Sequence, residues 1–388
     1  MAGDGGVAQH AQLRVRVVKR LVFALVALLS LTGVLVTAAD AQTRPAPGPH
    51  VWVIVLENKS YEETFGDSSP ATYLNGTLVP AGALLRQYYG TGHLSLDNYI
   101  SMISGQAPNP QTQGDCVYYN DFVSPNGGAL DGDGQALGNG CVYPTTVLTL
   151  ADQLKAARVP WRGYMEDMKS PCLHPALNTQ DDTQKAEVGD QYAARHNPFV
   201  YFHSIVDDDA YCQSRVVNLS QMSTDMAAVA TTPRFSFITP NLCNDGHDAP
   251  CVDGQPGGLV SADAFLQTWV PQITASPAYK KDGVLIVMFD ESEAAGSQSD
   301  TRFCCHEPTG PNTPMPGITG RGGGRMGAVV LSSRFVHPGT VTDEPYNHYS
   351  LLRTLEDLYG VTHLGYAAQS GLQSFGRDIF PMGKPRGR

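Results

Sequence analysis

The sequence predicts an α/β layered fold with a mostly parallel central sheet flanked by helices. Several short runs of β-branched and aromatic residues lack the alternation of a half-buried strand, as expected for strands buried on both faces of such a sheet. The clearest runs are residues 51–56, 235–238, 284–289 and 328–331. Helical patterns lie between them, and strands that alternate with helices indicate a layered α/β architecture.

The helices are predicted from the spacing of leucines and from their end signals. The predicted segments are residues 149–157, 262–270 and 349–359. Leu150 and Leu154 are spaced i, i+4 in the first segment. Gly360 follows the third segment, where a glycine commonly ends a helix.

The N-terminus predicts an export signal. Four Lys or Arg residues precede a short apolar run, and small residues then offer a cleavage site. An uncleaved membrane anchor is the alternative, but the run is short for a spanning helix. The predicted organisation is a signal peptide at 1–41, a linker at 42–49 and a single domain at 50–388. Gly, Asn, Asp and Pro are frequent at 107–143 and 295–324, which predicts surface insertions near a site, with simple decoration as the alternative.

The charge and the cysteines restrict the partners and the compartment. The formal net charge of −11 argues against nucleic acid as a partner and against electrostatic docking on anionic membranes. Eight cysteines, all after the predicted signal, favour a secreted or periplasmic location and local disulfides. The predicted pairs are Cys116 with Cys141, Cys172 with Cys212, and Cys243 with Cys251, leaving Cys304 and Cys305 as a vicinal pair or free thiols.

Polar residues follow three of the predicted strands, at the edge of an open α/β sheet where ligands gather. These residues are Glu57 and Asn58, Asp290 and Glu291, and Asp245 and His247. One carboxylate after a strand is ordinarily a turn residue or a helix cap, but repetition at three strands favours a site. Glu57, Asp290 and Glu291 cannot all ionise when buried together unless a cation lies among them. Oxygen ligands suit Mg²⁺, Ca²⁺ or Mn²⁺, whereas a cysteine zinc site is weakly indicated because no Cys-x-x-Cys occurs.

Ser95 is the candidate nucleophile because it precedes a helix-like run at 99–103. The dipole and free N–H groups at a helix N-terminus favour an alkoxide and phosphate oxygens, although a serine there is more often an N-cap. His93 and Asp97 stand where a nucleophile elbow requires glycines, which disfavours an α/β-hydrolase esterase. The sequence also lacks the glycine-rich phosphate loop of nucleotide-binding proteins.

Seven segments, in chain order from residue 50 to about residue 366, match the motifs of a known family. They are Glu57-Asn58-Lys59-Ser60, His93-Leu94-Ser95-Leu96-Asp97-Asn98-Tyr99, Glu166-Asp167, Arg195-His196-Asn197-Pro198, Pro240-Asn241 with Asn244-Asp245-Gly246-His247-Asp248, Asp290-Glu291, and Asn347-His348-Tyr349-Ser350. The chain resembles the bacterial phosphoesterase family of secreted acid phosphatases and phospholipases C, which is related to the alkaline phosphatases. It is most similar to the acid phosphatase branch that includes secreted phosphatidylinositol-3-phosphatases.

The resemblance implies an alkaline-phosphatase-like fold and a divalent metal ion, either Mg, Ca, Mn or Zn. The implied metal ligands are Glu57, Asn58, Asp290, Glu291 and the hydroxyl of Ser95. The residues implied around the phosphoryl group are His93, Asn98, His196, His247 and His348. Asp245, His247 and His348 are the implied residues of a second metal or phosphate position. Family members commonly carry proline in place of Leu94 and of Asp97, so the turn before Ser95 is expected to be looser here.

The expected activity is hydrolysis of phosphomonoesters, including phosphoinositide 3-phosphates, through a phosphoserine on Ser95. His348 and His196 are the candidate proton donors to the leaving alcohol. The alternatives are a phospholipase C that cleaves phosphodiesters and an inactive, secreted phosphate-binding protein. The expected partner is a small-molecule or lipid phosphate ester, with no nucleic acid and no stable membrane insertion after signal cleavage.

Overall fold

The computed structural model describes Met1 and residues 48–296, 299–381 and 383–384. Apart from Met1, the predicted signal peptide at 1–41 lies outside the described residues, as does most of the predicted linker at 42–49. The described residues from Gly48 onward belong to one compact unit, residues 47–388. In the described part of the chain, no helix combines the length and the apolar character needed to cross a membrane.

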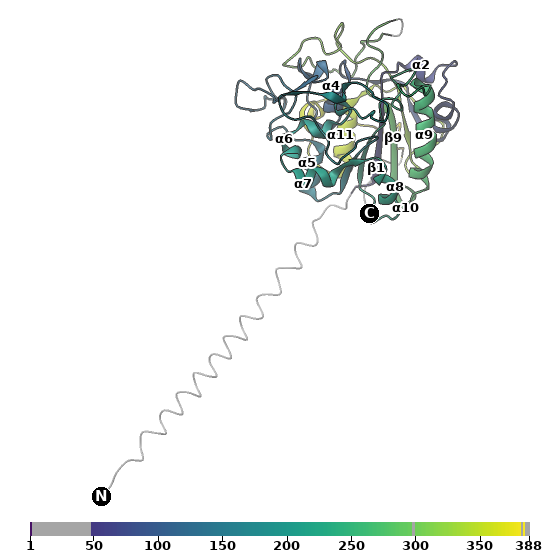
Figure 1. The fold of residues 1–388 in the computed structure, drawn as a ribbon. Helices are drawn as coiled ribbons and strands as arrows, with labels where there is room; N and C mark the ends of the chain where they lie inside the picture. Colours follow the sequence, from purple (N-terminus) through teal and green to yellow (C-terminus); the bar gives the residue numbers. More distant parts are fainter. Residues whose placement is uncertain (2–47, 297–298, 382, 385–388) are drawn as a thin grey trace. The chain divides into compact units, whose positions relative to one another are not determined.

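An eight-stranded sheet forms the centre of this unit, with the strand order β11-β2-β10-β9-β1-β8-β5-β7. Figure 1 labels two of its neighbouring strands, β1 and β9. Its strands in chain order are β1 (His50–Leu56), β2 (Ala83–Leu85), β5 (Trp161–Met165), β7 (Val216–Asn218), β8 (Phe235–Thr239), β9 (Gly283–Phe289), β10 (Ala328–Leu331) and β11 (Thr340–Thr342). All neighbouring strands are parallel except that β10 is antiparallel to both β2 and β9. The four predicted strands and the mostly parallel sheet are therefore confirmed.

Two shorter sheets pair β3 (Tyr88–Tyr89) with β12 (Tyr346–Asn347), and β4 (Tyr118–Tyr119) with β6 (Thr179–Gln180). The last pair joins the insertion at 107–143 to a later loop. Beyond these strands, the described parts of the two predicted insertions consist mainly of turns and irregular backbone.

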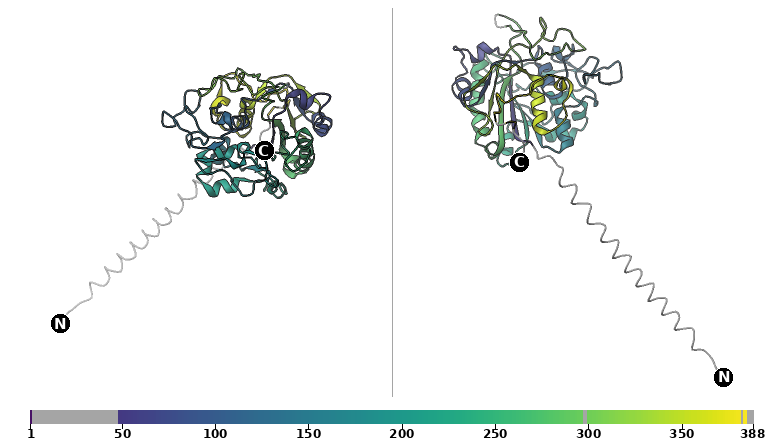
Figure 2. Two further views of the ribbon diagram at one scale, coloured as in Figure 1. Left: turned by 45° about the horizontal axis from the view of Figure 1, so that its top comes forward. Right: turned by 180° about the vertical axis from the view of Figure 1, so that it is seen from behind.

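The helices cover both faces of the sheet. In chain order they are α2 (Tyr61–Phe65), α3 (Val79–Ala81), α4 (Ser95–Ser104), α5 (Leu150–Ala157), α6 (His203–Val206), α7 (Asp209–Arg215), α8 (Gln221–Asp225), α9 (Gly258–Ala275), α10 (Pro277–Asp282) and α11 (His348–Tyr359). Figures 1 and 2 show α9 on one side of the sheet and α5 and α11 on the other. Helix α4 packs against α5 and α11. The three predicted helices and the layered α/β fold are confirmed.

The central strands are extended because their residues find apolar partners on both faces. Every residue of β1 and of β9 is buried. The two strands pair in parallel along seven positions, which end with Leu56 opposite Phe289. Strand β8 pairs in parallel with the other side of β1. The carboxyl ends of these three strands therefore meet at one edge of the sheet, where the chain turns polar.

All eight cysteines form disulfides, and the three predicted local pairs are confirmed. The fourth disulfide joins Cys304 to Cys305, which decides for the vicinal pair and against free thiols. The other bonds are Cys116–Cys141, Cys172–Cys212 and Cys243–Cys251.

Candidate active site

Two carboxylates lie side by side where β1 and β9 end. Because Leu56 pairs with Phe289, the next residues, Glu57 and Asp290, are neighbours at the sheet edge. Asn58 has a left-handed backbone (φ 38°), and its N–H donates to Asp290 Oδ1 at 3.1 Å. Its side-chain amide donates to Glu291 Oε1 at 3.2 Å. Asn58 therefore links both acidic residues at the end of β9 to the end of β1.

Ser95 faces this pair from the first turn of α4. Its hydroxyl donates to Glu57 Oε2 at 2.8 Å. The helix begins at Ser95, four residues before the predicted run, and Leu94 is the N-cap residue. Asp115, from the insertion at 107–143, accepts from the backbone N–H of Leu96 at 2.9 Å. Ser95 is therefore not an N-cap, and its side chain points to the carboxylates instead.

Asn98 fixes the turn before Ser95. Its side-chain oxygen accepts from the backbone N–H groups of Thr91 and Gly92 at 2.8 and 3.1 Å. Its amide nitrogen donates to the carbonyls of Gly92 and Leu94 at 3.1 and 2.9 Å. These four bonds hold the turn that was expected to be loose without the family's prolines. They also occupy both polar atoms of Asn98, so this residue positions Ser95.

His196 and Tyr99 stack beside Glu57. Their rings lie 5.3 Å apart and nearly parallel. The Tyr99 hydroxyl donates to Glu57 Oε1 at 2.6 Å, and His196 Nε2 lies 3.4 Å from the same oxygen. On its other side, His196 Nδ1 is 3.7 Å from Asp245 Oδ2. Burial lowers the pKa of His196 well below its usual range, so the ring is neutral between the two carboxyl groups.

His93 and Glu291 form a buried pair. His93 Nδ1 contacts Glu291 Oε2, and Nε2 bonds to the carbonyl of Asp300 at 3.0 Å. The backbone N–H of His93 donates to the carbonyl of Pro316 at 2.8 Å. Asp300 and Pro316 come from the insertion predicted at 295–324. Both ring nitrogens of His93 are therefore engaged within the protein, although a role near the phosphoryl group was predicted.

His348 begins α11 and contacts the same sheet edge. Its Nδ1 bonds to the Tyr88 hydroxyl at 3.0 Å, and its Nε2 bonds to the backbone carbonyl of Asp290 at 2.5 Å. Burial lowers the pKa of His348 to about 4. This neutral ring holds the backbone of Asp290, and neither nitrogen is left to transfer a proton to a substrate.

His247 lies closer to solvent than the other predicted histidines. Its side chain is 46% exposed, and Nδ1 bonds to Asp248 Oδ1 at 3.1 Å. That bond raises the pKa of His247 above its usual value. Its backbone N–H donates to Asp245 Oδ1 at 2.9 Å. The structure therefore brings Asp245 toward His196, while His247 pairs with Asp248 and His348 with Tyr88 and Asp290.

Burial dominates the pKa values of the carboxyl groups at the sheet edge. Burial is the main cause that raises the pKa of Glu57, against hydrogen bonds from Tyr99 and Ser95 that lower it. Burial and the neighbouring Glu57 raise the pKa of Asp290 and of Asp245 well above the usual range. Among the described residues, Asp290 Oδ2 and Asp245 Oδ2 have no hydrogen-bond partner. Buried carboxylate oxygens without donors suit a divalent cation with oxygen ligands.

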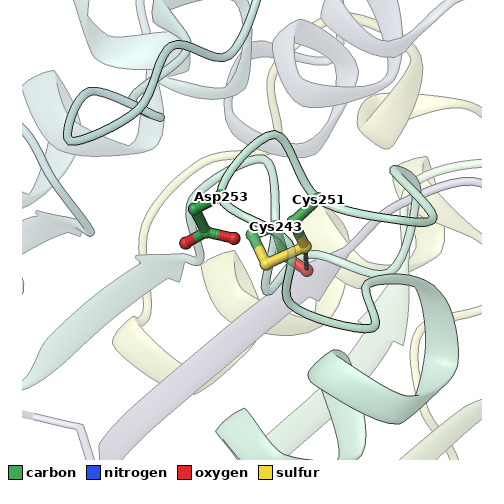
Figure 3. A group of neighbouring side chains, drawn as sticks. All are labelled: Cys243, Cys251 and Asp253. Atoms are coloured by element: carbon green, nitrogen blue, oxygen red, sulfur yellow. Dashed lines mark hydrogen bonds between the residues drawn. A yellow bond between two sulfur atoms is a disulfide. The ribbon is translucent and has the colours of Figure 1, made fainter.

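A cluster of ligand-type side chains elsewhere does not suit a metal ion. Cys243, Cys251 and Asp253 offer atoms within 4.8 Å of one another, the one such trio of His, Cys, Asp or Glu found in the described part of the chain. However, Figure 3 shows the two sulfur atoms bonded as a disulfide. A disulfide has no thiolate to offer a metal. Among the described residues, the predicted ligands at the sheet edge do not form an equally compact trio.

Three residues near Ser95 were not assigned a role from the sequence. Tyr99 bonds to Glu57, and Asp115 bonds to the first turn of α4. Arg195 lies 3.7 Å from Asp115, and its charge lowers the pKa of Glu57. Tyr99 and Arg195 lie inside segments that resemble family motifs, and this resemblance could have pointed to them. The sequence gives no comparable indication for Asp115, because only the folded insertion brings that residue to α4.

Comparison with known proteins identifies the family. The model of the Phosphoesterase family matches residues 71–362. The chain belongs to this family. The family resemblance predicted from the sequence is therefore confirmed.

Several curated proteins are similar to this phosphoesterase-family chain. A probable acid phosphatase of Kluyveromyces lactis is 24% identical over 81% of this chain and 59% of its own length. The chain therefore spans less than two thirds of that relative's length. A phosphate-repressible acid phosphatase of Penicillium chrysogenum is also 24% identical, over 81% of this chain and 59% of its own length. A phosphatidylinositol-3-phosphatase of Mycobacterium tuberculosis is 24% identical over 83% of this chain and 80% of its own length.

Solved structures also show similarity. A protein of the alkaline phosphatase superfamily from Vibrio parahaemolyticus has a TM-score of 0.44 and 12% identity, covering 87% of this chain and 74% of its own. A sulfatase from Pseudoalteromonas sp. has a TM-score of 0.48 and 11% identity, covering 90% of this chain and 75% of its own.

Proposed function

We propose that this chain is an exported, metal-dependent acid phosphatase that hydrolyses phosphomonoesters through a phosphoserine on Ser95. The observation that carries the proposal is the hydrogen bond of 2.8 Å from Ser95 Oγ to Glu57 Oε2, at a sheet edge rich in buried carboxyl groups. Family membership and the acid phosphatase relatives support the same reaction class.

The residues that would hold a metal ion are Glu57, Asn58 and Asp290, with the Ser95 hydroxyl; Glu291 completes the predicted set. The fit rests on the unpartnered oxygen of Asp290 and on the raised pKa values of the buried carboxyl groups. When bound, a divalent ion neutralises these carboxylates and supplies Lewis-acid stabilisation of charge on the phosphoryl oxygens. A second metal position at Asp245 with His247 and His348 stays a prediction.

The residues of the chain have distinct parts in the reaction. Ser95 Oγ attacks phosphorus and releases its proton toward Glu57 Oε2, while the bond from phosphorus to the leaving oxygen breaks. The leaving alkoxide takes a proton from solvent or from His247, the most exposed of the predicted histidines. Water then attacks the phosphoserine, which releases inorganic phosphate and returns the proton to Ser95 Oγ. His196 lies beside the carboxyl groups of Glu57 and Asp245, and neither of its ring nitrogens has a hydrogen-bond partner among the described residues.

Two further parts of the proposal concern substrate and location. Phosphoinositide 3-phosphates belong to the proposed substrates because the mycobacterial relative is a phosphatidylinositol-3-phosphatase. Export is supported by four disulfides in a chain whose cysteines are all paired. Such pairing is typical of oxidising compartments.

The test is an assay of the purified chain against 4-nitrophenyl phosphate, phosphatidylinositol 3-phosphate and phosphatidylcholine, with every product identified. The proposal expects inorganic phosphate from the first two and no phosphocholine from the third. Phosphocholine release would favour the phospholipase C alternative. Phosphate binding by calorimetry without hydrolysis would instead support the inactive binding protein and contradict the proposal.

Metal dependence has its own test. Dialysis against a chelator should abolish turnover of 4-nitrophenyl phosphate, and one of the added divalent ions should restore it. Asp290→Asn should raise the metal concentration needed for half-maximal activity, whereas Asp253→Asn, at the disulfide-bonded cluster, should leave it unchanged. Full activity after complete metal removal would contradict this part of the proposal.

A further inference from the structure

A cleft of about 500 Å³ opens beside the carboxylate site. Lys185, Arg195, His247 and Asp248 are among the residues that line it. Two of the lining residues adjoin that site: Arg195 directly precedes His196, whose Nε2 lies 3.4 Å from Glu57 Oε1, and the backbone N–H of His247 donates to Asp245 Oδ1 at 2.9 Å. A volume of this size suits the part of a small organic ligand that lies beyond its reacting group.

Two permanent cations face this cleft. Arg195 is anchored by its bond to the carbonyl of Gln184 at 3.0 Å and by Asp115 at 3.7 Å, and its side chain is only 11% exposed. Lys185 is exposed and follows Gln184 in the same loop. The carboxylate that lines the cleft, Asp248, is paired with His247. Asp115, which pairs with Arg195, does not line the cleft, so the lining itself offers two permanent cations against one carboxylate in a chain whose net charge is −11.

This charge is separate from the charge that the carboxylate site requires. Arg195 adjoins the carboxylate site through the next residue, His196, whose Nε2 lies 3.4 Å from Glu57 Oε1. Lys185, the second cation of the lining, follows Gln184, whose carbonyl accepts from Arg195, and no residue of the carboxylate site lines the cleft. An anion bound between these two cations would lie beside the phosphoryl group and not in its place.

We propose that the cleft binds a second anionic group on the leaving alcohol, so that the preferred substrates are phosphomonoesters carrying another phosphate. Arg195 and Lys185 are the specificity-determining residues for that group. The inference rests on the proposed function and names its substrate class. A soluble polyol bisphosphate and a phosphoinositide headgroup, whose phosphodiester supplies the second charge, share this chemistry.

The experiment compares inositol 3-phosphate with inositol 1,3-bisphosphate, which differ by the second phosphate. For the wild-type chain, kcat/KM should be about 30-fold higher for the bisphosphate, as expected for hydrogen bonds from charged donors. Lys185→Gln should reduce this ratio about tenfold. Lys281→Gln on α10, which precedes the opposite end of β9, removes the same charge and should leave the ratio unchanged.

Further assays separate a failure of the cleft assignment from a failure of the proposed phosphatase activity. Hydrolysis of 4-nitrophenyl phosphate, which lacks a second anionic group, tests the proposed function alone. If it is hydrolysed while the wild-type ratio is near one, the cleft assignment is overturned and the phosphatase assignment is not. A high ratio that Lys185→Gln leaves intact also overturns the cleft assignment. Phosphatidylinositol 3-phosphate in detergent micelles, compared with the soluble bisphosphate at equal concentration, distinguishes the lipid source from the soluble one.

Discussion

Helices α4 and α11 pack against each other, and each begins with a polar residue at the same sheet edge. The two first residues are used differently. Ser95 on α4 points its hydroxyl at Glu57, so the oxygen of the proposed nucleophile faces the carboxylates. His348 on α11 has both ring nitrogens bonded, to Tyr88 and to the carbonyl of Asp290. A polar residue at a helix start can therefore serve as the proposed nucleophile or as a structural support, according to the bonds that its side chain already makes.

The largest expected effect is on the α4 side. Ser95→Ala removes the attacking oxygen, so kcat/KM for 4-nitrophenyl phosphate should fall by at least about a thousandfold. The melting temperature should change little, because the hydroxyl makes a single bond to Glu57. Ser104→Ala, at the other end of α4, removes a hydroxyl bonded to the Ile100 carbonyl and should keep near-full activity. Substantial activity in Ser95→Ala would contradict the role of nucleophile.

A smaller loss is expected on the α11 side, together with a loss of stability. His348→Phe leaves the buried Tyr88 hydroxyl and the Asp290 carbonyl without this partner. Unpaired buried groups cost about 1 to 3 kcal/mol each, so the melting temperature should fall, and activity should fall about tenfold through displacement of Asp290. Thermal unfolding and the pH profile of kcat/KM check this. A residue acting as general acid would instead lose the corresponding limb of the pH profile at unchanged stability.

Tyr99→Phe tests how much a second side chain of α4 contributes at Glu57. The variant keeps the ring stacked on His196 and loses only the bond of 2.6 Å to Glu57. One such hydrogen bond corresponds to a fall of about three- to tenfold in kcat/KM, with the fold retained. Tyr349→Phe, on α11, is the matched control and should not change turnover. Equal effects of the two variants would show that the Tyr99 hydroxyl has no particular role at Glu57.

Glu356 on α11 should affect stability and not activity. Burial raises the pKa of Glu356 to about 9, so the folded state holds its proton more tightly than the unfolded state. The stability linked to this proton is full below the ordinary pKa of 4.5 and is lost as pH rises toward 9. Glu356→Gln mimics the protonated form and should be about 2 to 4 kcal/mol more stable near pH 7.5, with little difference near pH 4. Denaturant unfolding at both pH values checks this, with the exposed Glu344→Gln as the baseline.

The central strands could be predicted because runs of consecutive apolar residues indicate strands that are buried on both faces. Residues 51–56 and 284–289 are apolar throughout, and both strands extend by one residue in the structure. The three-residue strands β2, β7 and β11 have no comparable run, because they are extended through pairing with distant neighbours. The start of α4 was predicted four residues late, since the polar residues before Tyr99 carry no apolar periodicity.

At the site, too, positions that follow from the long buried strands could be predicted, whereas contacts made by loops could not. Glu57 and Asp290 follow long buried strands, so the parallel topology alone predicts that they meet. The contact of Asp115 with α4 and of Arg195 with Asp115 depends on how an insertion and a loop fold over the sheet edge. Sequence spacing contains no signal for such contacts. The engagement of His93 and His348 by backbone carbonyls was equally hidden, because residue type does not say which atoms are already bonded.

The most direct test of the central claim is a rapid-quench experiment with a phosphomonoester whose phosphoryl group is radiolabelled. Samples of the metal-loaded chain are quenched in acid during a single turnover, digested and mapped by mass spectrometry. The account predicts a label on the peptide that contains Ser95, which appears as substrate is consumed and disappears as phosphate is released. A label on another residue, or consumption of substrate with no labelled protein at any time, would contradict Ser95 as the covalent nucleophile.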